Sequence, residues 1–309
     1  MRRLAFIPAV IALVLLTLPA TPAAAGQRAH APAGGAAAAA RVHAYWTPER
    51  MRSARPLDLV VDRGGSARLR PGRPAAGAAA SFLRIETPEV PPYSVNGRIF
   101  VKQGNLRGYC SGTAINSPSR QLVLTAGHCV NNGHEGGRRT IWSQYLEFVP
   151  AYTAGHAPFG SFVAQRGKVY APLQWTKHGN PDFDLGAFLA APNETGVNVA
   201  DAVGGGAAIA LGLSRHQRFQ TFGYPGNVRR MQGCNSPYVG DDVLTNPFPG
   251  PPTMGIRCHW VPGASGGGWL IGDGTMINGV TSYLHSQNKN HTYGPYFTQE
   301  TVGRLVNGL

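Results

Sequence analysis

The sequence predicts an all-β fold that ends in a short helix, and three observations lead to this prediction. Only 14 % of the 309 residues are charged, which disfavours long salt-bridged helices. The apolar content of 43 % is sufficient for a buried core, and 41 glycines and 25 prolines supply many turns. Beyond about residue 82, short apolar runs alternate with turn residues, a pattern typical of sandwiches and barrels.

The first 25 residues have the layout of an export signal. Arg2 and Arg3 precede an uncharged apolar run over residues 4–18, and the small residues 23–25 follow. The run is shorter than a membrane span and contains a proline. We therefore expect residues 1–25 to be a signal peptide and the mature protein to be secreted, extracellular and without stable membrane association.

Residues 26–81 are dominated by Ala, Gly, Pro and Arg. This composition buries too little apolar surface to fold alone, so we expect a pro-segment or linker rather than a separate N-terminal domain. One more structured island, residues 42–61, can dock on the mature domain. The net charge is +9 over residues 1–85 and +4 over residues 86–309, so the folded part lacks the basic excess that nucleic-acid binding requires.

The mature domain is expected to start near Phe82, with a first lobe over residues 82–200 and a second over residues 201–309. Residues 272–274, Gly-Asp-Gly, lie between two apolar runs and predict a hairpin. Thr298 can cap a terminal helix that runs to Leu309, with an apolar residue on each side of the cap. The expected strands are Gln121–Thr125, Asp184–Leu189, Arg218–Gly223, Gly267–Ile271 and Met276–Tyr283.

The first candidate catalytic residue is His128, which follows an apolar strand and a small-residue turn in Leu-Thr-Ala-Gly-His-Cys. Neutral imidazole has a pKa suited to general-base catalysis near neutral pH. A histidine alone is more often a structural residue. Its surroundings, and a second motif later in the chain, favour the catalytic interpretation here.

The second motif is Pro-Gly-Ala-Ser-Gly-Gly-Gly over residues 262–268. Glycines on both sides of Ser265 allow a sharp turn that brings two amide groups to one point. The amides of Gly263 and Ser265 are the candidate oxyanion donors. Serine between glycines also occurs in plain turns, but this turn leads directly into the predicted hairpin.

A third group must orient the imidazole. Asp184 is preferred because it opens an apolar strand, where an acid is buried only with a partner. Asp182, two residues earlier, stays an alternative, and either acid can instead be a solvated loop residue.

The chain resembles the chymotrypsin-like serine proteases over roughly residues 95–309. The resemblance rests on Thr-Ala-Gly-His-Cys ending at Cys129, Gly-Ala-Ser-Gly-Gly around Ser265, and the chain order His, Asp, Ser. Phe-Gly-Tyr-Pro-Gly over residues 222–226 and the short serine loop look closest to the secreted bacterial branch that includes the V8-like glutamyl endopeptidases.

The resemblance implies two six-stranded antiparallel barrels, with a cleft between them and a C-terminal helix. It implies a triad in which Ser265 attacks the peptide carbonyl, His128 transfers the proton and Asp184 orients His128. Four cysteines in a secreted chain allow three pairings, and the resemblance implies Cys110–Cys129 and Cys234–Cys258. A zinc site is the rival interpretation of the His-Cys neighbours. No C-x-x-C spacing supports a zinc site, and we expect neither a metal nor a cofactor.

Two departures from the family pattern matter. Ala264 stands where many members have an acid that pairs with a new N-terminus, so we expect a zymogen that is activated by removal of a blocking pro-segment, cut between about Arg70 and Glu86. The substrate pocket implied by the resemblance has no acid at its floor, which leaves the preferred side chain open. Its expected residues are Thr281, Ser282, Tyr283, Leu284 and His259.

We therefore expect a secreted bacterial serine endopeptidase, monomeric by default, that acts on protein or peptide substrates and does not bind nucleic acid. Two other functions compete with this hypothesis. One is a catalytically inactive protease-like binding module, although no triad member is missing. The other is an esterase, because the chemistry of a triad does not itself select amides.

Overall fold

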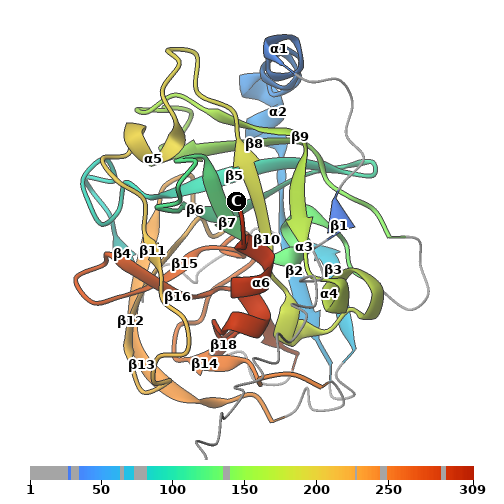
Figure 1. Ribbon diagram of the computed structural model, residues 1–309, viewed down its shortest axis with the longest axis vertical. Helices are drawn as coiled ribbons and strands as arrows, with labels where there is room; N and C mark the ends of the chain where they lie inside the picture. The colour runs from blue at the N-terminus through green and yellow to red at the C-terminus, as the bar shows by residue number, and fades with distance from the viewer. Residues whose placement is uncertain are drawn as a thin grey trace, which may run out of the picture.

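The computed structural model describes residues 27–28, 35–62, 66–72, 82–134, 140–226, 228–243, 249–286 and 290–309. The expected signal peptide lies outside these ranges. The described chain is mostly β, as predicted, and Figure 1 shows its strands grouped into two lobes. No helix in the described ranges is both long and apolar enough to span a membrane.

Six antiparallel strands close the first barrel. Around the ring the order is β5, β6, β7, β10, β9, β8 and back to β5. Most of their residues are buried, because strands of a small barrel pack on an interior filled with side chains. Their bounds are β5 Asn96–Gln103, β6 Leu106–Ala114, β7 Leu122–Thr125, β8 Gln144–Pro150, β9 Phe162–Ala171 and β10 Gly186–Ala190.

The second lobe repeats this arrangement with β12, β13, β14, β18, β17, β16 and β15. Only Thr281 and Ser282 separate β16 from β17, so the two act as one interrupted strand and complete a ring of six. The bounds are β12 Arg218–Gly223, β13 Gln232–Asp241, β14 Met254–Ile256, β15 Gly268–Ile271, β16 Met276–Val280, β17 Tyr283–His285 and β18 Thr292–Gly294.

Short elements connect and extend the barrels. β4 and β11 add to the second barrel at β13 and β16, and β1 pairs with β9 of the first. Their bounds, with those of the helices beyond residue 82, are β1 Gln27–Arg28, β4 Leu83–Arg84, α3 Gly127–Val130, α4 Leu173–His178, the 3-10 turn η2 Pro181–Phe183, α5 Val199–Ala202, β11 Ala208–Ile209, the π-type turn η3 Gln299–Gly303 and α6 Arg304–Val306.

Three element boundaries differ from the sequence predictions by more than one residue. The expected strand at Asp184 begins only at Gly186, because the amide of Asp184 closes the turn η2 by donating to the carbonyl of Pro181. The strand expected over Met276–Tyr283 is interrupted after Val280. The terminal helix begins after Thr298 with a capping box, as expected, but it ends at Val306.

The early end of the helix has a local cause. The chain leaves the helical conformation at Asn307, which has a φ of −60° and a ψ of 120°, and Gly308 follows with a φ of +79°. These two residues form a turn that the Leu309 amide closes by donating to the Val306 carbonyl. The two apolar residues that flank the cap, Phe297 and Val302, are both fully buried. The cap and its apolar contacts therefore fix the start of the helix, and the turn at Asn307 and Gly308 prevents its extension to Leu309.

The expected pro-segment packs against both barrels. It contains α1 Ala36–Tyr45, α2 Pro48–Ser53, β2 Arg55–Val61 and β3 Ala67–Pro71. Figure 1 shows this blue segment beginning at the outer end of the first barrel and continuing along it toward the second. The docking of the island at residues 42–61 is therefore seen in the structure, where the island forms the end of α1, all of α2 and the strand β2.

Candidate active site

His128 lies in α3, a single helical turn that directly follows strand β7. The turn has room only for small residues, because a Cβ added to Gly127 would come within 2.8 Å of the Trp175 ring and 2.9 Å of an Asp184 carboxylate oxygen. Small residues before the histidine thus allow the acid to approach the helix. The imidazole itself is fully buried.

Asp184 holds this histidine at two points. Its Oδ1 accepts a hydrogen bond of 2.7 Å from the His128 amide, and its Oδ2 lies 2.8 Å from His128 Nδ1. The hydroxyl of Ser282 donates to the same Oδ2 at 2.5 Å. A carboxylate with three donors in a buried site fixes the ring with Nδ1 protonated and leaves Nε2 as the basic nitrogen.

Asp182, the alternative acid, faces elsewhere. Its carboxylate accepts from the amide of Thr253 in the second barrel. Burial raises the pKa of Asp182 to about 7, against the opposing effect of the Thr253 hydrogen bond and with a further upward contribution from Asp242. Of the two candidate acids, the one that contacts the imidazole is Asp184.

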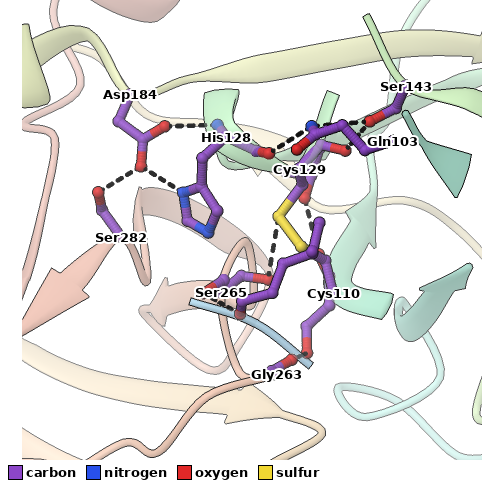
Figure 2. Close-up of a disulfide and its surroundings, with 12 residues drawn as sticks. Gln103, Cys110, His128, Cys129, Ser143, Asp184, Gly263, Ser265 and Ser282 are labelled. Carbon is purple, nitrogen blue, oxygen red and sulfur yellow. Dashed lines mark hydrogen bonds and ion pairs between the residues drawn. A yellow bond between two sulfur atoms is a disulfide. The ribbon is translucent and has the colours of Figure 1, made fainter. Parts of the chain in front are cut away.

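Ser265 lies in the glycine-rich loop that leads into β15. Two neighbours in this loop adopt left-handed φ angles, +101° at Gly263 and +81° at Gly266. A Cβ on Gly266 would lie 2.0 Å from the Thr125 hydroxyl, so only glycine fits there. In Figure 2, Ser265 lies on the side of the His128 ring opposite to Asp184.

The serine loop is held from the first barrel by residues that the sequence analysis missed. The hydroxyl of Ser111 donates to the carbonyl of Gly263 at 2.9 Å, and its amide donates to the carbonyl of Ser265 at 2.7 Å. Ser111 follows Cys110 on β6, and nothing in the local sequence distinguishes it. Only the packing of one barrel on the other reveals its role.

The Ser265 hydroxyl is hydrogen-bonded to the N-terminal segment. Ser265 Oγ donates to the main-chain carbonyl of Leu57 at 3.4 Å, and the amide of Gly263 donates to the same oxygen at 3.3 Å. Within the described residues, buried Nε2 of His128 has no hydrogen-bond partner. Figure 2 shows a blue ribbon from this segment passing beside Ser265 and Gly263. A blocking pro-segment was expected from the sequence, but not the residue of it that contacts Ser265.

The five residues expected in the substrate pocket have different environments. Ser282 donates to Asp184, so its side chain supports the acid. Thr281 accepts from the Trp269 indole, and Tyr283 donates to the buried Asp242. Leu284 is half-buried beside Val60 in the pairing of β17 with β2, whereas His259 is exposed.

Both disulfides implied by the resemblance are present. Cys110–Cys129 joins β6 to the turn that carries His128, and Cys234–Cys258 joins β13 to the segment before Ser265. The sulfur atoms of the first pair lie within 4.8 Å of a His128 ring nitrogen. Zinc binds thiolates, and a disulfide supplies none, so this group is not a suitable metal-binding set.

A buried arginine lies behind the serine loop. The guanidinium of Arg98 stacks on Tyr109 at 3.6 Å, and a Cβ on Gly263 would lie 2.6 Å from the Tyr109 ring. Burial lowers the pKa of Arg98, while the surrounding tyrosines Tyr109, Tyr152 and Tyr224 oppose that effect. The aromatic residues around this cation thus pack against one side of the serine loop.

Solved structures of proteases share this architecture. The protease Anisep from Arthrobacter nicotinovorans is 30% identical, with a TM-score of 0.60, and the match covers 70% of this chain and 96% of Anisep. The thermostable serine protease AL20 from an extremophilic microorganism is 27% identical, with a TM-score of 0.60 over 69% of this chain and 95% of that protein.

A Glu endopeptidase, solved in complex with MPD, has a TM-score of 0.58 at 20% identity, over 73% of this chain and 94% of that protein, and it shows the fold alone. No protein-family model matches the chain, and neither does any curated protein at a significant level. The two barrels, the buried histidine and acid beside the serine loop, and the likeness to Anisep over nearly its whole length together show that the chain belongs to the chymotrypsin-like serine proteases.

Proposed function

We propose that this protein is a serine endopeptidase that works through an acyl-enzyme intermediate. The observation that carries the proposal is the buried pair of Asp184 and His128, held by two hydrogen bonds on the side of the imidazole away from Ser265. This pairing makes Nε2 the basic nitrogen that a serine hydroxyl requires.

In the proposed reaction, Ser265 Oγ attacks the carbonyl carbon of the peptide while His128 Nε2 accepts the hydroxyl proton. The C–N bond then breaks, and the imidazolium gives its proton to the departing amine. Water attacks the acyl-enzyme by the same route and releases the acid. Asp184 stabilises the imidazolium, and the amides of Gly263 and Ser265 bind the oxyanion, where one donor commonly contributes about a hundredfold or more in turnover.

Several finer features belong to the same proposal. We place the protein outside the cell because of the expected export signal and the two disulfides. We also propose that it acts as a monomer on peptide or protein substrates. Within the family, the segment Phe222–Gly226 and the short serine loop favour the secreted bacterial branch that includes V8-like enzymes. No preference for a glutamate side chain is proposed, because Thr281 lies near the place where glutamyl-specific relatives are expected to have a histidine, and His285, a few positions on, is buried against Asp242.

A fluorophosphonate probe and a peptide-library digest test this function together. We expect the probe to label Ser265 once the N-terminal segment has been removed, and the Ser265→Ala variant to remain unlabelled. We also expect cleavage within peptides from the library. Labelling with ester hydrolysis but no peptide cleavage would identify an esterase, and a folded protein that never reacts would identify a binding module.

A further inference from the structure

Strand β2 lies between the two barrels and pairs with both of them. Its first residues pair in parallel with β6, where Pro56 lies opposite Tyr109, and its last residues pair in parallel with β17, where Leu59 lies opposite Tyr283. Strand edges with open hydrogen-bonding groups are natural binding sites for an extended peptide. In the described structure, these two edges beside the candidate site are already paired with β2.

The same strand engages the groups proposed for catalysis. The Leu57 carbonyl accepts from both the Gly263 amide and the Ser265 hydroxyl, whereas His128 Nε2 has no partner among the described residues. An activated serine must be hydrogen-bonded to its base. The hydroxyl instead donates to the carbonyl of the bound strand, so Ser265 is not paired with its proposed base while the strand is bound.

The side chains of β2 explain why it stays in the cleft. Leu57, Leu59 and Val61 are almost fully buried at alternate positions, as expected for a strand with one face on a core. Leu57 packs on Gly108, where a Cβ would come within 2.8 Å of it. Strand β3 covers the outer edge of β2 through an antiparallel pairing.

A second contact area anchors the segment far along the first barrel. The Trp46 indole donates to the carbonyl of Tyr145 at 2.6 Å, and Tyr45 stacks on the Tyr145 ring at 4.2 Å. His43 lies 3.1 Å from Glu147, which is buried on β8. These contacts are all noncovalent, and they do not depend on the link between Gly72 and Phe82.

We propose that residues 36–72 are an inhibitory segment that binds the cleft noncovalently, remains bound after the chain is cut beyond Gly72, and inhibits the enzyme in trans. This inference rests on the proposed protease function and adds its regulation. Cutting alone does not open the site. Activity appears when the cut segment dissociates, so it depends on protein concentration.

The test uses the full chain with a recognition sequence for an unrelated, sequence-specific protease inserted between Gly72 and Phe82. Fluorophosphonate labelling and peptide hydrolysis are measured before the cut, after the cut at high concentration, and after dilution. We expect little reaction in the first two states and full reaction after dilution. A synthetic peptide of residues 54–72, added to the diluted enzyme, should raise KM for the substrate and leave kcat unchanged.

Matched variants identify the strand as the inhibitor. Leu59→Ala removes a buried side chain and should weaken segment binding about 30-fold or more, the equivalent of a buried leucine truncation. Arg68→Ala, on the exposed face of β3, should leave binding unchanged. Binding of the peptide is also measured by calorimetry on the cut and diluted Ser265→Ala variant, so that the result does not depend on catalysis.

The outcomes separate the inference from the proposed function. If the uncut chain hydrolyses peptides as fast as the cut and diluted enzyme, the inhibitory role is overturned while the protease function stands. If no form reacts but the peptide binds the Ser265→Ala variant, the binding surface is supported and the protease function is overturned. If the peptide does not bind, and the uncut Leu59→Ala chain shows the same labelling and peptide hydrolysis as the uncut parent chain, the segment is not the inhibitor.

Discussion

At the residue scale, the Asp184 carboxylate is a buried charge that orients the imidazole of His128. Its carboxylate is fully buried, and its partners are the amide and imidazole of His128 and the hydroxyl of Ser282. Hydrogen bonds from three donors offset the cost of removing the charge from water. The carboxylate is therefore stable when buried and has a fixed orientation. Through its hydrogen bonds it also fixes the orientation of the His128 imidazole.

Ser282→Ala removes one of the three donors and should reduce kcat about tenfold, the effect of one hydrogen bond to a charged group. KM should change little, because the hydroxyl faces the acid and not the substrate. Steady-state kinetics with a peptide substrate measure both constants. Ser282→Thr, which keeps the hydroxyl, is the rescue control, and an effect confined to KM would instead assign Ser282 to the substrate pocket.

The pH dependence of docking follows from two residues of the inhibitory segment. Burial raises the pKa of Asp58 to about 6, although the charges of His128 and Arg70 oppose it. The hydrogen bond to Glu147 raises the pKa of His43. Both groups hold their proton more tightly when docked, so docking is strongest in acid and weakens as the pH rises.

For Asp58, the loss falls between about pH 4, its ordinary pKa, and about pH 6, its docked value, and amounts to roughly a hundredfold in Kd. Calorimetry with the peptide of residues 54–72 on the cut and diluted Ser265→Ala variant measures this slope. The Asp58→Asn peptide should bind with almost no pH dependence in this window. An equal slope for both peptides would show that another group controls docking.

At the element scale, the disulfide Cys110–Cys129 ties strand β6 to the one-turn helix that carries His128. Short helices have little stability of their own, so α3 keeps its position through this bond and through the contacts of Asp184. The other disulfide closes a loop of similar length, 24 residues against 19, and lies in the second barrel rather than at the turn that carries His128. The two bonds therefore form a matched pair for experiment.

Removal of either disulfide by serine substitution should lower the free energy of unfolding by about 2 to 4 kcal/mol, measured by denaturant titration of the Ser265→Ala variant. In the catalytically competent background, loss of Cys110–Cys129 should also lower kcat by more than loss of Cys234–Cys258. Equal kcat values for the two variants would mean that α3 is placed without help from its disulfide.

At the scale of the whole molecule, the inhibitory segment belongs to the main core. Trp46, Leu57, Leu59 and Val61 lie in one hydrophobic cluster with residues of both barrels. A buried aliphatic side chain contributes about 1.5–3 kcal/mol. The segment therefore stabilises the fold and blocks the cleft with the same side chains, so that inhibition and stability are linked.

Removal of the segment should lower Tm by about 10 °C or more, because its three buried aliphatic side chains each contribute about 1.5–3 kcal/mol and a protein of this size shifts by about 2–4 °C per kcal/mol. Scanning calorimetry of the Ser265→Ala variant, uncut and after cutting and separation of the segment, measures the change. The cut but unseparated complex, at high concentration, is the control and should melt close to the uncut chain. An unchanged Tm after separation would show that the segment adds nothing to the core.

Several features of this protein were determined by residues that are close neighbours in the sequence. The Gly-Asp-Gly turn over residues 272–274 joins β15 to β16, and Thr298 caps the terminal helix, because turns and caps depend on neighbouring residues. The residue types around His128 and Ser265 likewise made these positions recognisable. Their glycines meet local steric demands, as Gly266 does against Thr125.

Only the tertiary structure decided which distant groups meet. The local sequence favoured Asp184 and left Asp182 as an alternative, and it was the packing of the turn η2 beside α3 that brought Asp184 to the imidazole. Residues Ser111 and Leu57 carry no local signal. Ser111 nevertheless holds the serine loop, and the Leu57 carbonyl accepts from the Gly263 amide and the Ser265 hydroxyl. Such roles arise because a main-chain carbonyl or a single hydroxyl acquires its function from its position, which is fixed by the way the two barrels and the N-terminal strand pack together.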